Sequence, residues 1–292
     1  MWKVAQAAVQ GRGHISADIP CQDKTFFVRK NDACAISLAD GAGSAMFSHF
    51  GAEKVVECVS NLLIDRFDEF YRESDPSAVR REVLSCILND LETLKETLGC
   101  ELSDLASTLL CAVVHDRRYI IFHLGDGVIG YQDDEALKVA SVPDNGEFCN
   151  TTVFTTSENA EASIKLLKGE MSDSIKGFVL FSDGVESILY KHNKKEISQS
   201  LSPVFDDLAQ QDSSEVEQNL LETLEEIKTH TQDDCSIIVM SKVPDSETSD
   251  EDASLPEKHF RKYVPAIIVG AVLLIVLMSS AFFLYYNGYG RQ

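Results

Sequence analysis

The stretch that decides the fold is ACAISLADGAGSAM, residues 33–46, where an apolar run ends at Asp40 and a glycine follows. The same pattern occurs twice more: YIIFHLGDG ends at Asp126 and its glycine, and GFVLFSDG ends at Asp183 and its glycine. Asp-Gly after an apolar run is a strong signal for a hairpin turn, because both residues tolerate positive φ angles. A turn is the simpler interpretation of any single instance. Three instances raise a second interpretation, in which the aspartates are ligands.

The composition is that of a globular protein with an acidic surface. The chain has 292 residues, of which 44% are hydrophobic, and 26 Lys and Arg stand against 47 Asp and Glu, for a net charge of −21. Such a surface repels a phosphate backbone, and no basic stripe with interleaved aromatic residues is present, so we expect no nucleic-acid partner. Eight cysteines are scattered without a CxxC pair, which is typical of buried thiols in a reducing compartment.

An uncharged segment close to the C-terminus predicts a membrane anchor. Residues 264–286, VPAIIVGAVLLIVLMSSAFFLYY, contain no charge and would form a helix of about 35 Å, enough to cross a hydrocarbon core of about 30 Å. Basic residues precede this segment, so by the positive-inside rule we expect the large N-terminal part to be cytoplasmic. The prediction is a single-pass protein with a transmembrane helix over 263–286 and a short tail over 287–292.

Residues 244–262 are predicted to link the anchor to a folded domain. The first part, PDSETSDEDASLPE, has six acidic residues and no basic one, and the last part is basic next to the predicted helix. This composition cannot support a core, so we expect a solvated tether that its own charge keeps extended. Residues 1–243 then remain as one domain.

The pattern of apolar residues within this domain predicts helices and strands in alternating sets. Helical periodicity covers 50–72, 77–98 and the region from 216 to 227, with a weaker signal over 194–211. Short turns join successive apolar strands, so the sheets should be largely antiparallel, and the helices occur in pairs between strand sets. We expect an α+β domain in which two packed sheets are flanked by helices. The expected strands are KTFFVR, ACAISLA, TLLCAVVH, RYIIFHL, VIGYQ, TTVFTT, GFVLFS and CSIIVMS.

Hairpin geometry predicts where the aspartates lie. If KTFFVR pairs with ACAISLA across the turn at 31–32, Asp23 lies opposite Asp40, and the hairpin about 116–117 puts Asp126 at the same kind of strand end. If GFVLFS and CSIIVMS are antiparallel neighbours, Asp183 also meets Asp233. Several carboxylates would then converge at the ends of the strands.

Converging carboxylates repel one another unless a cation compensates their charge. The candidate ligands are all oxygen atoms, which favours the hard cations Mg²⁺ or Mn²⁺. The glycine after Asp40, Gly41, lets the backbone turn so that its own carbonyl can face a metal. A two-metal site of this kind can activate a bridging water for in-line attack on a phosphate ester, and no covalent nucleophile is then required.

These motifs in this order resemble the metal-dependent Ser/Thr protein phosphatases of type 2C, in particular their compact bacterial-like branch. The resemblance runs from GRGHISADIPCQDK through LADGAG, STLL, HLGDG and LFSDG to DDCSII, and it covers nearly all of residues 1–241. It implies a four-layer α-β-β-α sandwich whose sheet edges hold two Mn²⁺ or Mg²⁺ ions, with room for a third. Water would be the nucleophile toward phosphoserine or phosphothreonine.

The resemblance also implies a role for each acidic residue. Asp40 would bridge both metals, and the carbonyl of Gly41 and, through water, Asp23 would complete their shells. Asp183 and Asp233 would hold the second metal. Asp126 would be either a residue behind the ligands or a ligand of a third ion, and it is the one of the three Asp-Gly aspartates best explained as a turn. Asp234 stands where the family usually has Asn, so it ranks below Asp233 as a ligand.

The sequence departs from the family pattern at two positions. The family often has an Arg five residues before the first metal-associated Asp, to clamp the substrate phosphate, and Asp18 occupies that position here. Many members also have a His directly after the first Asp-Gly, and Ala42 occupies that position. Arg12 or His14 from the same N-terminal loop are our candidates to replace these functions, with His14 as phosphate contact or proton donor.

The leading hypothesis is therefore a membrane-anchored, cytoplasm-facing phosphatase in signalling, acting on phosphorylated proteins and opposing a Ser/Thr kinase by dephosphorylating that kinase or its substrates. A second hypothesis is a catalytically silent scaffold that binds phosphoproteins with the same fold. A third is a two-metal phosphodiesterase acting on nucleotides, which the acidic surface disfavours.

Overall fold

The computed structural model describes residues 1–143 and 152–244. The chain separates into two units, Met1–Glu247 and Thr248–Gln292. The predicted transmembrane helix over 263–286, the tail and all but the first residue of the predicted linker lie outside the described residues. Within the two described ranges, no helix is long and apolar enough to cross a membrane.

Two five-stranded sheets form the centre of the domain. All neighbouring strands in them are antiparallel, in the order β1-β12-β9-β6-β7 in the first sheet and β2-β3-β4-β5-β8 in the second. A separate two-stranded hairpin joins β10 to β11. The strands are β1 Trp2–Val9, β2 Lys24–Lys30, β3 Ala33–Ala39, β4 Leu109–His115, β5 Arg118–Leu124, β6 Val128–Gln132, β7 Leu137–Ser141, β8 Lys165–Glu170, β9 Gly177–Phe181, β10 Tyr190–Lys191, β11 Glu196–Ile197 and β12 Cys235–Lys242.

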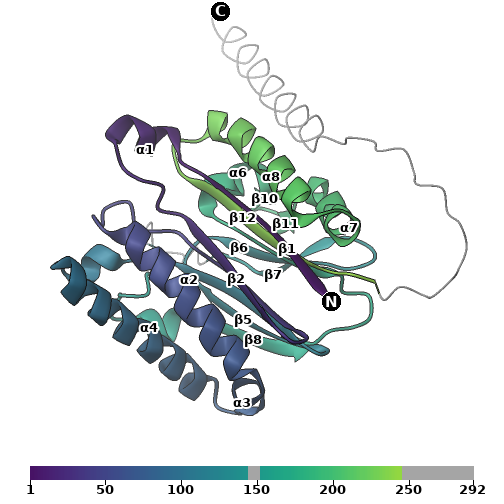
Figure 1. The fold of residues 1–292 in the computed structure, drawn as a ribbon, viewed down its shortest axis with the longest axis horizontal. Helices are drawn as coiled ribbons and strands as arrows, with labels where there is room; N and C mark the ends of the chain where they lie inside the picture. Colours follow the sequence, from purple (N-terminus) through teal and green to yellow (C-terminus); the bar gives the residue numbers. More distant parts are fainter. Residues whose placement is uncertain (144–151, 245–292) are drawn as a thin grey trace, which may run out of the picture. The chain divides into compact units, whose positions relative to one another are not determined.

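Helices cover the outer face of each sheet (Figure 1). On the second sheet α2 packs against β2, β3 and β4, and α4 lies outside α2; on the first sheet α7 and α8 pack against β1 and β12. The α-helices are α1 Arg12–Ala17, α2 Ser48–Asp65, α3 Phe67–Arg72, α4 Pro76–Leu98, α5 Ala160–Ser163, α6 Glu186–Leu189, α7 Ser202–Gln210 and α8 Ser213–Ile227, and the 3₁₀ turns are Leu102–Leu105, Asp183–Val185, Gln199–Leu201 and Lys228–His230. The predicted α+β domain with two antiparallel sheets and flanking helices is confirmed for the described residues.

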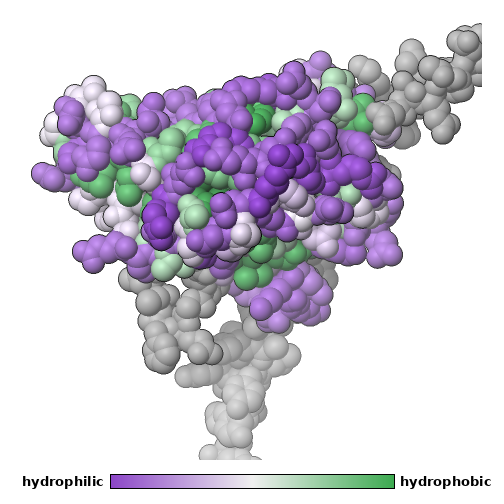
Figure 2. Space-filling view, turned by 90° about the horizontal axis from the view of Figure 1, so that it is seen from below, coloured by the Kyte–Doolittle hydropathy of each residue, from purple (hydrophilic) through white to green (hydrophobic). Residues whose placement is uncertain are grey.

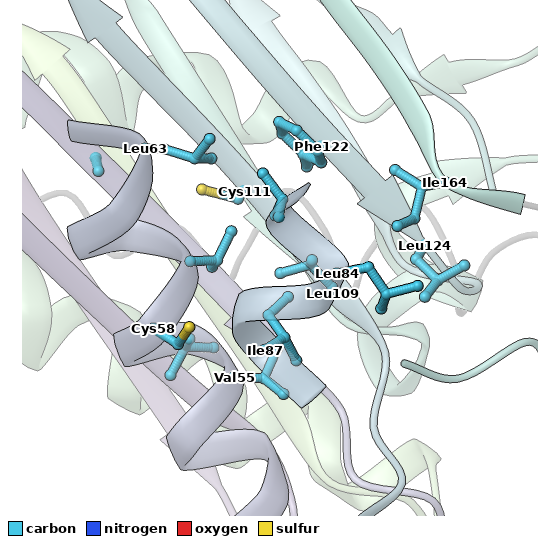
Figure 3. Packing of buried hydrophobic residues seen from close by; sticks show 14 of the residues in the cluster. Val55, Cys58, Leu63, Leu84, Ile87, Leu109, Cys111, Phe122, Leu124 and Ile164 are labelled. Carbon is cyan, nitrogen blue, oxygen red and sulfur yellow. The ribbon is translucent and has the colours of Figure 1, made fainter. Parts of the chain in front are cut away.

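Alternate side chains of the central strands enter two different cores. Ile36 and Leu38 of β3 face the first sheet, whereas Ala35 of the same strand faces α2. We call the core between the second sheet and helices α2 and α4 the outer core. Figure 3 shows it, with Leu63 of α2 and Ile87 of α4 among side chains of β4 and β5. Because β3 and β4 are buried on both faces, nearly every residue in them is apolar, and this is why they are readily recognised in the sequence.

The surface of the domain is polar. Figure 2 shows one face on which hydrophilic residues predominate, interrupted by smaller hydrophobic patches. The exposed large hydrophobic side chains among the described residues include Met46, Ile15 and Leu221, which lie on different elements. The apolar content of the sequence is therefore used mainly inside the two cores.

Several sequence predictions of individual elements are wrong. The helix expected over 50–72 is two helices, because Arg66 between them has a non-helical backbone (φ −117°, ψ 25°). In the stretch TTVFTT, residues 152–156 form no strand, and Ala160–Ser163 follows as a short helix. Of 194–211, only Ser202–Gln210 is α-helical, with a proline in its first turn. Five strands were not predicted. Strands β1, β7 and β8 lack a run of β-branched residues and are stabilised by their sheet partners, and β10 and β11 have only two residues each.

Candidate metal centre

The predicted strand registers are confirmed, and they bring the aspartates to one end of the sandwich. Lys24 of β2 pairs with Ala39 of β3, so the next positions outward are Asp23 and Asp40. In the β4–β5 hairpin, Leu109 pairs with Leu124, two residues before Asp126. All of these strand ends belong to the second sheet.

The first sheet contributes the remaining carboxylates. Strands β9 and β12 are antiparallel neighbours, with Phe181 paired with Ile237. Asp183, which follows β9, therefore lies at the same end of the sheet as Asp233, which precedes β12. The loop after β9 also contacts the loop before β12, because Gly184 packs closely on the backbone of Asp234. A Cβ atom at position 184 would lie 1.8 Å from the Asp234 carbonyl oxygen.

We call Asp23, Asp40, Asp126, Asp183 and Asp233 the acidic cluster. Within it, one carboxylate oxygen from each of Asp40, Asp126 and Asp183 lies within 4.8 Å of the other two. Asp126 is thus a full member of the cluster, although the sequence favoured a turn at this position. Its Oδ2 atom also accepts a hydrogen bond from the Thr152 hydroxyl at 2.5 Å, which fixes the orientation of the carboxylate.

Burial and mutual repulsion raise the pKa values in the cluster. Burial, followed by the charges of Asp23 and Asp183, raises the pKa of Asp40 well above its usual range. Burial, followed by the charges of Asp126 and Asp233, raises the pKa of Asp183 to about 7. No lysine or arginine is among the groups that determine these two values. Within the part of the chain that the structure describes, neither Asp40 nor Asp183 therefore has a lysine or arginine to compensate its charge.

Asp23 is the most deeply buried member of the cluster. Its side chain is 2% exposed, and burial raises its pKa to about 6, although the neighbouring Ser236 and Ser182 hydroxyls lower it in part. Among the described residues, neither of its carboxylate oxygens has a hydrogen bond of normal geometry, and the same holds for Oδ1 of Asp183. Buried carboxylate oxygens that lack donors suit a hard divalent cation, which prefers oxygen ligands. The residues present therefore fit Mg²⁺ or Mn²⁺.

The backbone around Gly41 is held by its neighbours on both sides. Thr108 donates to the Asp40 carbonyl through its N–H, and its hydroxyl accepts from the Asp40 N–H, each at 2.8 Å. A Cβ atom at Gly41 would lie 2.8 Å from the Cβ atom of Ser48, the first residue of α2. Glycine at this position thus permits close packing of the loop on the helix, in addition to the turn that the sequence suggested.

The two consecutive aspartates before β12 have different surroundings. Asp233 accepts a hydrogen bond from the Asp234 N–H at 2.9 Å, and burial raises its pKa, which the Asp234 N–H and then the nearby His14 partly lower. Asp234 uses both carboxylate oxygens on the N-terminal loop, where it accepts from the N–H groups of Gly11 and Gln22 at 2.6 Å each. This difference agrees with the lower rank that the sequence gave Asp234 as a ligand.

The N-terminal loop with α1 carries the predicted phosphate contacts. His14 lies beside the cluster, with its Nδ1 atom 2.9 Å from Oδ2 of Asp234. Arg12 is exposed, and its Nε donates to the carbonyl of Thr231 at 3.0 Å. Asp18 ends α1 in the left-handed conformation, and the N–H of Ala42 donates to the carbonyl of Ala106. Neither of the residues at these two departures from the family pattern provides a basic side chain.

Sequence reasoning missed one polar residue that organises this region. Gln22 is 2% exposed, and its side-chain amide donates to the Ser48 hydroxyl at 2.6 Å, which ties the Asp23 loop to the start of α2. A glutamine next to an aspartate carries no spacing signal, so only the tertiary contact identifies it.

Comparison with known proteins gives matches to a sequence family, to a curated protein and to solved structures. The sequence model of the family "Protein phosphatase 2C" matches residues 10–225. The chain is 24% identical to Serine/threonine-protein phosphatase 3 of Escherichia coli K12 over 192 residues, which are 64% of this chain and 75% of that protein. Among solved structures, it resembles a bacterial serine phosphatase, with a TM-score of 0.56, 14% identity and coverage of 82% and 98% of the two chains. The Ser/Thr phosphatase of S. agalactiae has a TM-score of 0.56, 15% identity and coverage of 82% and 99%.

Proposed function

Because the chain belongs to the protein phosphatase 2C family, we propose that it is a metal-dependent hydrolase of phosphoserine and phosphothreonine in proteins. The predicted enzyme class, a protein Ser/Thr phosphatase, is confirmed by that membership. The observation that supports metal-dependent chemistry is the half-buried group of Asp40, Asp126 and Asp183, which offers oxygen ligands only. Within the described residues, no lysine or arginine is among the charges that set the pKa values of Asp40 and Asp183.

The acidic cluster would hold two Mn²⁺ or Mg²⁺ ions. Asp40, the carbonyl of Gly41, Asp183 and Asp233 would hold them, with Asp23 acting through water. Asp126, which lies within 4.8 Å of two of these ligands, would either orient them or bind a third ion. When bound, the ions would supply an activated water as nucleophile and neutralise charge on the phosphoryl oxygens.

The protein itself would orient the phosphate and exclude bulk water. Burial of Asp23 and Asp40 keeps the inner part of the site shielded by protein, and this strengthens every charge interaction there. His14, which lies beside Asp233, would contact the phosphate or donate the proton that the leaving hydroxyl requires. Arg12 would contribute positive charge from the exposed side of the same loop. The substrates would be phosphorylated proteins, with a Ser/Thr kinase or its targets as natural partners.

Turnover of a phosphothreonine peptide by the full-length chain tests this proposal. We expect hydrolysis with Mn²⁺ or Mg²⁺, loss of activity in EDTA, and loss in Asp183→Asn. Asp134→Asn is a matched control, because Asp134 is exposed between β6 and β7, outside the cluster, and undergoes the same chemical change. Full activity in EDTA would contradict the metal-dependent mechanism. Binding of the phosphopeptide without turnover at saturating Mn²⁺ would favour the silent scaffold, and turnover of nucleotide phosphodiesters alone would favour the third hypothesis.

We also propose that residues 263–286 anchor the protein in a membrane with the phosphatase domain on the cytoplasmic side. The support is the uncharged run over 264–286 with Lys258, Arg261 and Lys262 before it. We expect the full-length chain to remain in the membrane fraction after alkaline carbonate extraction. Leu274→Arg in the middle of the run should release it, because a central Arg opposes insertion by roughly 3 kcal/mol. Recovery of the unmodified chain in the soluble fraction would contradict the proposal.

A further inference from the structure

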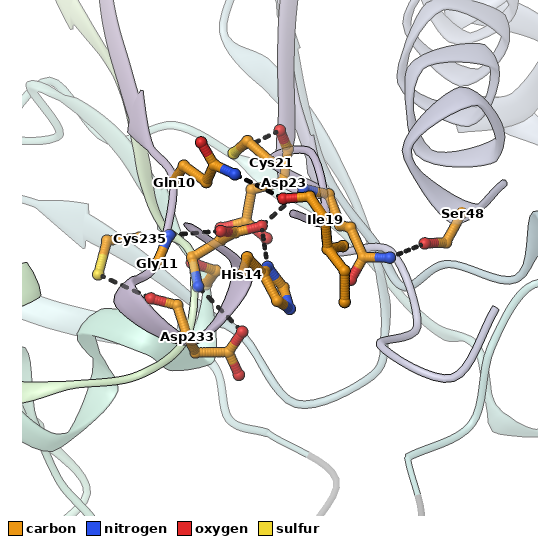
Figure 4. Close-up of polar contacts among 12 residues, drawn as sticks. Gln10, Gly11, His14, Ile19, Cys21, Asp23, Ser48, Asp233 and Cys235 are labelled. Atoms are coloured by element: carbon orange, nitrogen blue, oxygen red, sulfur yellow. Dashed lines mark hydrogen bonds and ion pairs between the residues drawn. The ribbon is translucent and has the colours of Figure 1, made fainter. Parts of the chain in front are cut away.

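Asp234 connects three parts of the N-terminal loop to the start of β12. Its side chain is buried, with 1% of the residue exposed. Its Oδ1 atom accepts from the Gly11 N–H at 2.6 Å, and its Oδ2 atom accepts from the Gln22 N–H at 2.6 Å. The same Oδ2 atom lies 2.9 Å from Nδ1 of His14, at ion-pair distance but without the geometry of a hydrogen bond (Figure 4). One carboxylate thus faces three nitrogen atoms from the loop.

This arrangement requires a carboxylate and not an amide. Two backbone N–H groups and the His14 ring nitrogen must share both side-chain oxygens of Asp234, whereas an asparagine has one oxygen and would turn its NH₂ group toward a donor. The resemblance described above implies Asn at this position, and this chain has Asp instead. It occurs together with His14, where the chain also lacks the usual phosphate-clamping Arg.

The N-terminal loop has other contacts to the same segment. The Gly13 N–H donates to the Gln232 carbonyl at 2.8 Å, and Arg12 Nε donates to the Thr231 carbonyl at 3.0 Å. Gly11 lies so close that a Cβ atom there would be 2.3 Å from the carbonyl carbon of Asp233. These contacts hold the loop independently of the Asp234 carboxylate. Substitution of Asp234 should therefore change the orientation of His14 before it releases the loop.

We propose that Asp234 is a positioning residue for His14. By pairing with a protonated Nδ1, it fixes the imidazole beside the acidic cluster and leaves Nε2–H as the donor that meets the substrate phosphate. Asp234 then acts through His14 and binds no metal, because both of its oxygens are committed to the loop. The proposal rests on the proposed phosphatase function, which supplies the phosphate.

A double-mutant cycle in the full-length chain separates positioning from a merely structural role. With saturating Mn²⁺ and a phosphothreonine peptide, Asp234→Asn and His14→Gln should each lower kcat by about 10- to 100-fold, the range typical of a supporting partner. The double variant should be no slower than His14→Gln alone, because Asp234 has nothing to position once the imidazole is absent. Thermal melts in excess Mn²⁺ verify that all variants are folded. A full further loss in the double variant, or unchanged kcat in Asp234→Asn, would overturn the proposal.

The state of the His14 ring gives a readout that does not depend on activity. In ¹⁵N-histidine-labelled protein with Mg²⁺, we expect the Nδ1 atom of His14 to carry a proton, and Asp234→Asn should shift the ring toward the Nε2–H tautomer. A wild-type ring protonated on Nε2 alone would overturn the positioning role. If the wild type hydrolysed no phosphopeptide, the phosphatase proposal would fail, while this measurement would still decide whether Asp234 orients His14.

Discussion

The outer core beneath the second sheet is fully buried and the acidic cluster at its strand ends is partly buried, and the two have opposite effects on stability. In the outer core, Leu63 and Ile87 are fully buried among apolar side chains, and such burial is the main favourable contribution to folding. In the cluster, Asp23 is buried and Asp40 is half-buried beside other carboxylates, and burial together with the neighbouring charges raises the pKa values of both. Strand β3 belongs to the core along its length and delivers Asp40 at its end. The core therefore stabilises a fold that must hold an unfavourable group of charges in place.

We expect the largest effect from Asp40→Asn, which tests whether the acidic cluster serves activity at a cost in stability. Loss of the central carboxylate should lower kcat/KM by more than about 100-fold, since even partners behind metal ligands are worth 10- to 100-fold. The same change removes one repelling charge, so it should raise the Tm of the metal-free protein in EDTA, by about 3 °C for each kcal/mol gained. Phosphopeptide turnover and thermal melts measure the two effects.

Asp134→Asn is the control for Asp40→Asn, because it removes an exposed carboxylate at the surface. It should leave both turnover and Tm nearly unchanged. If Asp40→Asn kept full activity, or lowered the Tm of the metal-free protein, the site would not be a group of mutually repelling metal ligands.

Truncation in the outer core should have the opposite pattern. Leu63 is 0% exposed, so Leu63→Ala should destabilise the protein by about 3 kcal/mol through lost burial and a cavity. Leu63 lies near the end of α2 opposite to Ser48, the residue that packs against Gly41. We therefore expect kcat of the folded protein at saturating Mn²⁺ to change less than about 2-fold. Urea unfolding and turnover at low temperature measure these quantities.

Leu221→Ala is the matched control for Leu63→Ala, because the same side chain is 36% exposed on α8. Its effect on the free energy of unfolding should stay within about 0.5 kcal/mol, as for most surface substitutions. Equal destabilisation by the two variants would show that the outer core does not dominate stability.

The sequence predicted the core and the convergence of the aspartates for the same reason. The strands β3, β4, β9 and β12 are buried on both faces, so their apolar runs are continuous and their turns are well marked, and the register of a short hairpin follows from its turn. The sequence alone therefore predicts that Asp23 lies opposite Asp40, one position beyond the pair Lys24 and Ala39. Strand β8, KLLKGE, lies at the edge of the second sheet, and its own residues favour no strand; pairing with β5 decides its conformation.

Other features depend on contacts that the sequence does not encode locally. The inclusion of Asp126 in the cluster depends on how the two sheets pack, because Asp183 belongs to the first sheet and Asp126 follows a strand of the second. The role of Asp234 depends on a loop more than 200 residues earlier in the chain. The hairpin register places Asp126 at the same kind of strand end, but no spacing rule gives its approach to Asp183 or the contacts of Asp234.

The repulsion in the cluster should also appear as pH-dependent stability of the metal-free protein. In the folded state the pKa of Asp183 is raised from 3.8 to about 7 and that of Asp23 from 3.8 to about 6. The folded protein therefore retains protons that the unfolded chain releases, and this contribution to stability is present at low pH and lost as pH rises toward 7. In EDTA, Tm should be higher at pH 5.5 than at pH 8. Added Mg²⁺ should stabilise most at pH 8, where the carboxylates are free of protons.

Asp183→Asn should flatten this pH dependence, whereas Asp134→Asn should leave its slope unchanged. The comparison is needed because a net charge of −21 also gives a general repulsion that rises with pH. An unchanged slope in Asp183→Asn would mean that the cluster is not its source.

The smallest expected effect comes from an acidic residue outside the cluster. Asp75 is exposed at the N-terminus of α4, where its carboxylate accepts a hydrogen bond from the Ser77 N–H at 2.9 Å. A carboxylate there satisfies a free N–H group and interacts favourably with the helix dipole, so Asp75→Ala should cost about 1 kcal/mol. Asp75→Asn, which keeps the hydrogen-bond acceptor, should cost less, and neither change should alter phosphopeptide turnover. An increase in stability for Asp75→Ala would mean that the acidic surface as a whole destabilises the fold. The destabilising effect of the acidic cluster would then have to be explained by the net charge of the protein and not by burial of the carboxylates.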